Sequence, residues 1–131
     1  MGQTITFNEQ GIKFWGKAMV EHSPLFHPLS PTPEPEENDW FVGMGHGHFE
    51  ESDVNSGRSS IILPKDISDS PFDYIALGHW DLYTDVSQGN IPAVYSGCPM
   101  VSGIENATGS VSLVDLDSKK GAVHRQWFLE S

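Results

Sequence analysis

Residues 72–81 read Phe-Asp-Tyr-Ile-Ala-Leu-Gly-His-Trp-Asp, an apolar run that stops at a glycine and leads directly into a histidine. A short apolar run of this kind is typical of a strand buried on both faces. Residues 40–48 repeat the design, because Trp-Phe-Val-Gly-Met leads into Gly-His-Gly-His. We predict that both segments are buried strands and that polar ligand-type side chains follow each of them.

The side chains that follow the two strands are all of types that bind metals. They are His46 and His48 after the first strand, and His79 and Asp81 after the second. In extended backbone residues i and i+2 point to the same face, so each pair can converge. Three imidazoles and a carboxylate suit a divalent ion such as Zn, Mn, Fe or Ni. The alternative is that Gly-His occurs twice by chance in solvated turns, but its repetition after two buried strands favours the metal site.

The rest of the chain also predicts strands, with loops between them. Residues 23–39 hold five Pro and four acidic residues, a composition that forbids both helix and central strand and therefore predicts a surface loop. A short helical turn is expected around Asp66, and Trp80 and Tyr95 are expected to pack at strand ends. Alternating or apolar stretches predict further strands at 3–7, 12–19 and 91–96, and a terminal hairpin made of 110–117 and 122–129.

Composition limits the classes of protein that this chain can belong to. The 131 residues suffice for a single domain, 1–131. Seven Lys and Arg against 18 Asp and Glu give a net charge of −11, which repels phosphate backbones and makes a nucleic-acid partner unexpected. One Cys excludes a disulfide within the chain. Neither a membrane-spanning run nor a signal peptide is visible, so we expect a cytoplasmic protein that does not contact membranes.

These segments resemble the C-terminal half of the calcineurin-like metallophosphoesterases, in particular the DNA-repair-exonuclease-like branch. Residues 72–81, with Ala-Val-Tyr-Ser-Gly-Cys-Pro at 93–99, are similar to that family's Asp-Tyr-(hydrophobic)-Ala-Leu-Gly-His-x-His and Tyr-x-Gly-Ser-Pro motifs. The resemblance implies an α+β, β-rich fold corresponding to the second half of a four-layer αββα sandwich. It also implies that His46 and His79 bind metal at the carboxyl ends of the strands, with Asp81 where the family more often has His.

The motifs of the family's first half do not occur in this sequence. They are Asp-x-His, Gly-Asp-x-x-Asp and Gly-Asn-His, which supply the bridging Asp and the His that protonates the leaving group. The resemblance therefore implies a phosphoester or phosphodiester hydrolase domain that is incomplete and inactive alone. The missing half is expected from a separate chain or a longer product.

Two other functions remain open from the sequence. The chain can be a non-catalytic remnant that serves as an interaction module, or a cupin-like protein that binds one metal through His46 and His48. In either the remnant or the half-enzyme, an apolar sheet face would be open to solvent. We therefore expect a homo-oligomer that covers this face.

Overall fold

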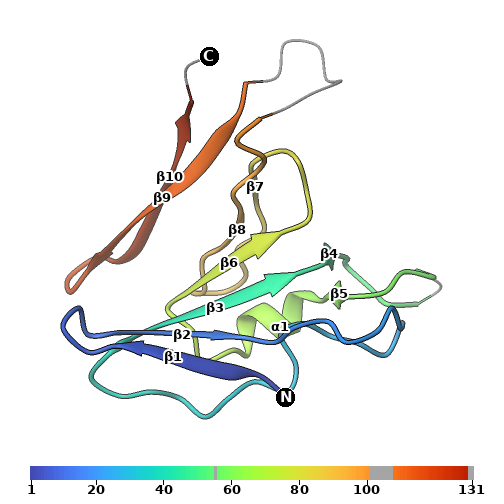
Figure 1. Cartoon of the computed structure of the whole chain (residues 1–131), viewed down its shortest axis with the longest axis horizontal. Coiled ribbons are helices and arrows are strands. Elements are labelled where there is room, and N and C mark those ends of the chain that lie inside the picture. The colour runs from blue at the N-terminus through green and yellow to red at the C-terminus, as the bar shows by residue number, and fades with distance from the viewer. Residues whose placement is uncertain (55, 101–107, 130–131) are drawn as a thin grey trace.

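The computed structural model describes residues 1–54, 56–100 and 108–129. The protein is β-rich, with a mixed six-stranded sheet, a separate terminal hairpin and one short helix in the described residues (Figure 1). The sheet has the strand order β1-β2-β3-β6-β8-β7. Its strands are β1 (Gln3–Phe7), β2 (Ile12–Gly16), β3 (Trp40–His46), β6 (Tyr74–Gly78), β8 (Ala93–Tyr95) and β7 (Thr84–Asp85). Outside it lie β4 (His48–Phe49), β5 (Ile61–Ile62), α1 (Pro64–Ser68), β9 (Ser110–Asp117) and β10 (Gly121–Phe128).

Parallel pairing in the centre of the sheet decides where the histidines lie. Strands β2, β3, β6 and β8 are parallel neighbours, while β1 and β7 run antiparallel at the two edges. The carboxyl ends of β3 and β6 therefore lie at the same edge, and His46 is opposite Gly78 in the register. The predicted juxtaposition of the two Gly-His segments follows from this pairing.

The loop that joins β2 to β3 is long and irregular, as its prolines predict. Strand β2 ends at Gly16, three residues before the predicted end of the alternating stretch, because its pairing with β3 ends where Gly16 meets Met44. Residues 17–39 contain no helix or strand, and they return the chain to the start of β3. Within this loop Leu29 is fully buried, which anchors the loop against the sheet.

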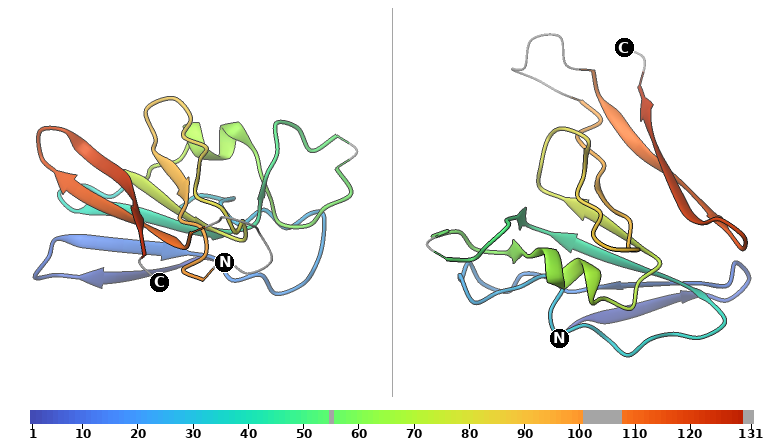
Figure 2. Two further views of the ribbon diagram at one scale, coloured as in Figure 1. Left: turned by 90° about the horizontal axis from the view of Figure 1, so that it is seen from above. Right: turned by 180° about the vertical axis from the view of Figure 1, so that it is seen from behind.

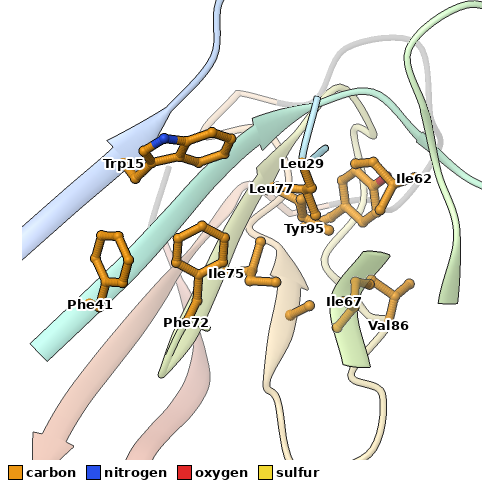
Figure 3. Packing of buried hydrophobic residues seen from close by; sticks show 11 residues of the cluster. Trp15, Leu29, Phe41, Ile62, Ile67, Phe72, Ile75, Leu77, Val86 and Tyr95 are labelled. Atoms are coloured by element: carbon orange, nitrogen blue, oxygen red, sulfur yellow. The ribbon is translucent and has the colours of Figure 1, made fainter. Parts of the chain in front are cut away.

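One face of the sheet holds the main core of the protein (Figure 3). Trp15 and Phe41 from the strands pack against Phe72, with ring centroids 5.5 and 5.0 Å apart. A Cβ atom on Gly43 would lie 2.6 Å from the Phe72 ring, so glycine is required for this close approach. Helix α1 closes the same face with Ile67, and its Asp66 carboxylate accepts a hydrogen bond from the Leu63 N–H at 2.8 Å.

The opposite face of the sheet is only partly covered. Val42, Tyr74 and Val94 are buried there, where part of the hairpin β9–β10 packs against them. The rest of the hairpin extends away from the sheet (Figures 1 and 2). A cavity of about 290 Å³ separates the hairpin from these strands. On the same face Met44 remains 50% exposed, so an apolar surface is open next to the end of β3.

In the described residues, no helix has both the length and the apolar character needed to cross a membrane.

Candidate functional site

His46 and His79 lie at the shared carboxyl edge of β3 and β6. His46 is the last residue of β3, and His79 follows the last residue of β6. The two imidazole centroids are 5.1 Å apart. A Cβ atom on Gly78 would lie 3.1 Å from His46 Nδ1, so the glycine at this position leaves room for the His46 ring. The sequence prediction that these two side chains meet at strand ends agrees with this geometry.

His48 reaches the same place by a different route from the one predicted. Gly47 ends the extended run, and His48 begins β4, which pairs with β5 and not with the main sheet. The Ser60 carbonyl accepts a hydrogen bond from the His48 N–H at 2.9 Å and lies so close to Gly47 that a Cβ atom at this position would collide with it. The resulting turn brings His48 Nε2 to 2.7 Å from His79 Nε2, with ring centroids 4.1 Å apart. His46 and His48 thus flank the same third histidine.

The backbone of His79 does not have the extended conformation of a strand residue. His79 has a φ of 120°, which is rare for a residue with a Cβ and costs of order 1–3 kcal/mol. Such conformations cluster at functional sites, where the surrounding structure maintains them. The bend at His79 means that the same-face rule for residues i and i+2 does not apply to His79 and Asp81.

The structure brings three of the four predicted ligands together but not Asp81. The Asp81 side chain is exposed, and among the described residues its carboxylate has no hydrogen bond to His46, His48 or His79. Its backbone carbonyl accepts a hydrogen bond from the Cys98 N–H at 2.9 Å, which joins the two loops after β6 and β8.

Two donors that the sequence analysis did not connect with the histidines contact His48. The Trp80 indole Nε1 donates to His48 Nδ1 at 3.3 Å. Arg58 Nη1 lies 3.0 Å from Nδ1 and 3.2 Å from Nε2 of the same ring. Arg58 also pairs with Glu50, its Nε lying 3.4 Å from Oε1. Arg58 lies in an irregular loop and belongs to no sequence motif. Only the fold shows that it lies beside His48.

Tyr95 fixes the backbone on both sides of His48. Its buried hydroxyl donates to the Gly47 carbonyl at 2.6 Å and accepts from the Phe49 N–H at 2.8 Å. Trp80 stacks on the Tyr95 ring, with centroids 4.2 Å apart and an interplanar angle of 13°. The sequence predicted both aromatic residues as packing at strand ends. The structure adds that this packing holds the His48 loop in place.

The surroundings of His48 favour its neutral form. Burial lowers the pKa of this imidazole, and the neighbouring His79 and Arg58 lower it further. An open hollow of about 540 Å³ lies next to the cluster and is lined by His46 together with Met44, Ala76 and Lys17. A ligand can therefore approach His46 from the open face of the sheet.

As a donor set, the cluster fits part of a divalent metal site. Imidazole nitrogens suit Zn, Mn, Fe and Ni, and His46 and His79 reach one edge from separate strands. Across residues 1–54, 56–100 and 108–129, however, no three or more His, Cys, Asp and Glu side chains are arranged so that they could hold an ion. Further ligands, or a movement of these side chains, would be needed to complete a coordination shell.

No protein-family model matches the sequence, and no curated protein matches it significantly.

Proposed function

We propose that this domain is the C-terminal half of a metal-dependent phosphoesterase site, with His46 and His79 as metal ligands. The observation that carries the proposal is the meeting of these two rings, 5.1 Å apart, at the carboxyl ends of adjacent parallel strands. Ligand sites in sheets of this kind are expected outside the carboxyl ends of the strands. A divalent ion of the Mn, Zn, Fe or Ni type would, when bound there, polarise a phosphoryl oxygen and lower the pKa of a bound water.

The other residues at this edge are proposed to contribute in a secondary way. His48 and Arg58 place hydrogen-bond donors beside His79. Asp81 is the candidate carboxylate, and it would join the site if the loop after His79 changed its conformation. The phosphodiester or phosphomonoester nature of the substrate is left open, although a net charge of −11 does not favour a nucleic acid held by this chain alone.

This half-site needs a second polypeptide segment for catalysis. The sequence contains no Gly-Asn-His and no Asp two residues before a His, so it lacks the motifs that supply the bridging Asp and the leaving-group His in the family that it resembles. The second segment would pack on the open sheet face, where Met44 is half exposed and the hollow reaches His46. Alone, the 131 residues are expected to be inactive, because transition-state charge would remain uncompensated.

The second candidate function is a non-catalytic interaction module that keeps the sheet and has lost the chemistry. One observation favours it, namely that the described residues hold no complete metal-binding group. This alternative predicts that the protein, alone or with a partner, neither binds a divalent metal at His46 and His79 nor hydrolyses a phosphoester.

Co-expression tests the proposed function. The domain is produced with a chain that carries Asp-x-His, Gly-Asp-x-x-Asp and Gly-Asn-His motifs, and hydrolysis of an activated phosphodiester is measured with Mn²⁺, Zn²⁺ or Ni²⁺. We expect turnover from the complex, none above the metal-only background from the domain alone, and loss of turnover in a complex with His79→Ala and Asp81→Ala. Turnover by the isolated domain, or a complex that forms but remains inactive, would contradict the half-site proposal.

A further inference from the structure

The terminal hairpin and the six-stranded sheet leave a cavity of about 290 Å³ between them. Its floor includes Val42, Tyr74 and Val94, which are buried on the sheet face that the hairpin partly covers. Its wall includes Val114 and Leu116, which lie two residues apart on β9 and therefore point to the same face of the hairpin. Two separate units of the fold thus contribute to one cavity.

Hydrogen bonds from both strands of the hairpin hold it around this cavity. On β9 the Ser112 hydroxyl lies 3.2 Å from the Tyr74 hydroxyl. On β10 His124 Nδ1 lies 2.7 Å from the Tyr83 hydroxyl. Because both strands are attached in this way, the cavity is preformed and does not have to be created by a ligand.

The walls of the cavity are apolar and carry no charge. Of the described side chains that line it, only Tyr74, Ser96 and Ser112 are polar, and all three carry neutral hydroxyls. Burial raises the pKa of the Tyr74 phenol, so this group keeps its proton. A charged ligand would lose its hydration here without gaining an opposite charge, which is costly. The cavity therefore selects uncharged molecules.

A cavity of this kind suits a small apolar molecule better than water. A buried water needs about two to four polar partners, and two of the three side-chain hydroxyls on the described walls are bonded to one another. Protein interiors rarely leave voids much larger than a water molecule, because the side chains that line a void lose contacts. The volume is close to the lower limit, about 300 Å³, of pockets that bind small molecules.

We propose that this cavity binds a small, uncharged, apolar molecule that carries one hydroxyl group, which pairs with the Tyr74 and Ser112 hydroxyls. Two hydroxyls joined by one hydrogen bond still offer a ligand both a donor and an acceptor. At about 30 Å³ for each water molecule in the liquid, the cavity has room for roughly ten non-hydrogen atoms, the size of a bicyclic phenol such as 2-naphthol. The site is independent of the proposed phosphoesterase function, because His46, His79 and Met44 do not line it.

Fluorescence titration of the full chain with 2-naphthol at pH 7 tests the proposal. We expect saturable binding with a Kd on the order of 10–100 µM, which lies within the range that ligand efficiency allows for a molecule of this size. The carboxylate 2-naphthoate has the same rings and a negative charge, and it should bind at least about tenfold more weakly because the charge finds no partner. Absence of saturable 2-naphthol binding, or equal affinity for the two compounds, would overturn the proposal.

The variant Val114→Trp tests the place of binding, because a larger side chain at this position fills the cavity from β9. We expect it to weaken 2-naphthol binding at least about tenfold. The control is Leu113→Trp, which places the same side chain on the opposite face of the same strand, at a 37% exposed position, and should bind 2-naphthol as the unmodified protein does. Circular dichroism shows whether each variant folds. Unchanged affinity in folded Val114→Trp would contradict the proposed site.

The variant Ser112→Ala keeps the proposal testable if Val114→Trp does not fold. We expect its affinity for 2-naphthol to fall about threefold to tenfold, since one neutral hydrogen bond is lost. Naphthalene, which has no hydroxyl, should bind equally to this variant and to the unmodified protein. An equal loss for both compounds, or no loss for either, would overturn the assignment of the hydroxyl pair.

Sedimentation velocity distinguishes a small molecule from the other candidate occupant, a side chain of a second copy of this chain. We expect saturating 2-naphthol to leave the association of the protein unchanged, because the cavity lies under the hairpin and Met44 does not line it. Dissociation of an oligomer by 2-naphthol would show that a second copy fills the cavity and would overturn the proposal.

Discussion

At the scale of single residues, Tyr95 shows how a core side chain supports the candidate site. Its ring is fully buried under Trp80, and its hydroxyl bridges two backbone groups of the His48 loop. Burial raises the pKa of this phenol well above its usual value and outweighs the hydrogen bond from the Phe49 N–H, which lowers it. The hydroxyl therefore acts as a fixed hydrogen-bonding group and not as an acid.

Removal of that hydroxyl should destabilise the protein measurably. In Tyr95→Phe the Gly47 carbonyl and the Phe49 N–H lose their shared partner, which should lower the free energy of unfolding by about 1–3 kcal/mol. Urea denaturation measures the change. The control is Tyr74→Phe, whose hydroxyl forms, within the described part of the chain, one hydrogen bond to the half-buried Ser112 hydroxyl and whose loss should cost less. A cost no greater than that of the control would show that Tyr95 does not hold the His48 loop.

The sequence could predict some residues of the candidate site but not the contacts among them. The Gly-His pattern after two buried strands predicted that His46 and His79 would meet, because parallel pairing of those strands is enough to bring them together. The i, i+2 spacing predicts that Asp81 lies beside His79 only where the backbone is extended, and the φ of 120° at His79 removes that condition. Arg58 could not be predicted, since its position depends on a loop without periodicity.

At the scale of elements, the terminal hairpin is attached to the sheet by a small polar network. His124 on β10 lies with Nδ1 2.7 Å from the Tyr83 hydroxyl and with Nε2 3.3 Å from Asp85 Oδ2 on β7. No sequence pattern connects His124 with these partners, because Tyr83 and Asp85 are distant from it along the chain. These bonds join β10 to the β7 edge, beside the cavity that separates the hairpin from the sheet.

The attachment of the hairpin should weaken in acid, and Asp85 should account for part of the loss. Burial raises the pKa of Asp85, but hydrogen bonds from Ser87 and the neighbouring His124 lower it more, so the pKa of this carboxyl lies below its ordinary value of 3.8. A carboxyl whose pKa is lowered by folding stabilises the protein above the unfolded value, and this contribution is lost as the pH falls through the folded value. The stability advantage of the unmodified protein over Asp85→Asn should therefore shrink between about pH 5 and pH 3. Urea denaturation at each pH measures it, and a constant difference would contradict this account.

The elements themselves were largely predictable, and their ends were not. Alternation predicted the strands of the first pair, β1 and β2, and the terminal hairpin, and apolar runs predicted β3, β6 and β8, because burial selects these patterns directly. The predicted strand 12–19 ends at Gly16, where the pairing of β2 with β3 stops opposite Met44 although β3 continues to His46. Gly47 divides the predicted extended run at 40–48 into β3 and β4, because the Ser60 carbonyl occupies the space next to it.

At the scale of the whole molecule, the partly open sheet face suggests association. Ile5 and Phe7 on β1 are 63% and 48% exposed and continue the apolar surface that includes Met44. The hairpin covers only one end of this face. An apolar face next to a candidate site is expected to bind another polypeptide, and in a preparation of this chain alone the available partner is a second copy.

The isolated protein should therefore form a dimer or higher oligomer at micromolar concentration. In Met44→Glu a carboxylate would be buried in that interface, which should weaken association at least about tenfold. The control is Leu25→Glu, which places the same charge on an 88% exposed position in the loop between β2 and β3. Sedimentation velocity measures all three proteins. A stable monomer, or equal association of the two variants, would contradict the assignment of this face as the interface.

The central claim is that His46 and His79 form half of a metal site, and calorimetric titration of the protein with Zn²⁺ tests it most directly. We predict saturable binding that falls at least about 100-fold in His46→Ala and in His79→Ala, because each removes a ligand. The control is His22→Ala, an exposed loop histidine, which should bind Zn²⁺ as the unmodified protein does. No saturable binding, or binding that neither His46→Ala nor His79→Ala changes, would contradict the claim.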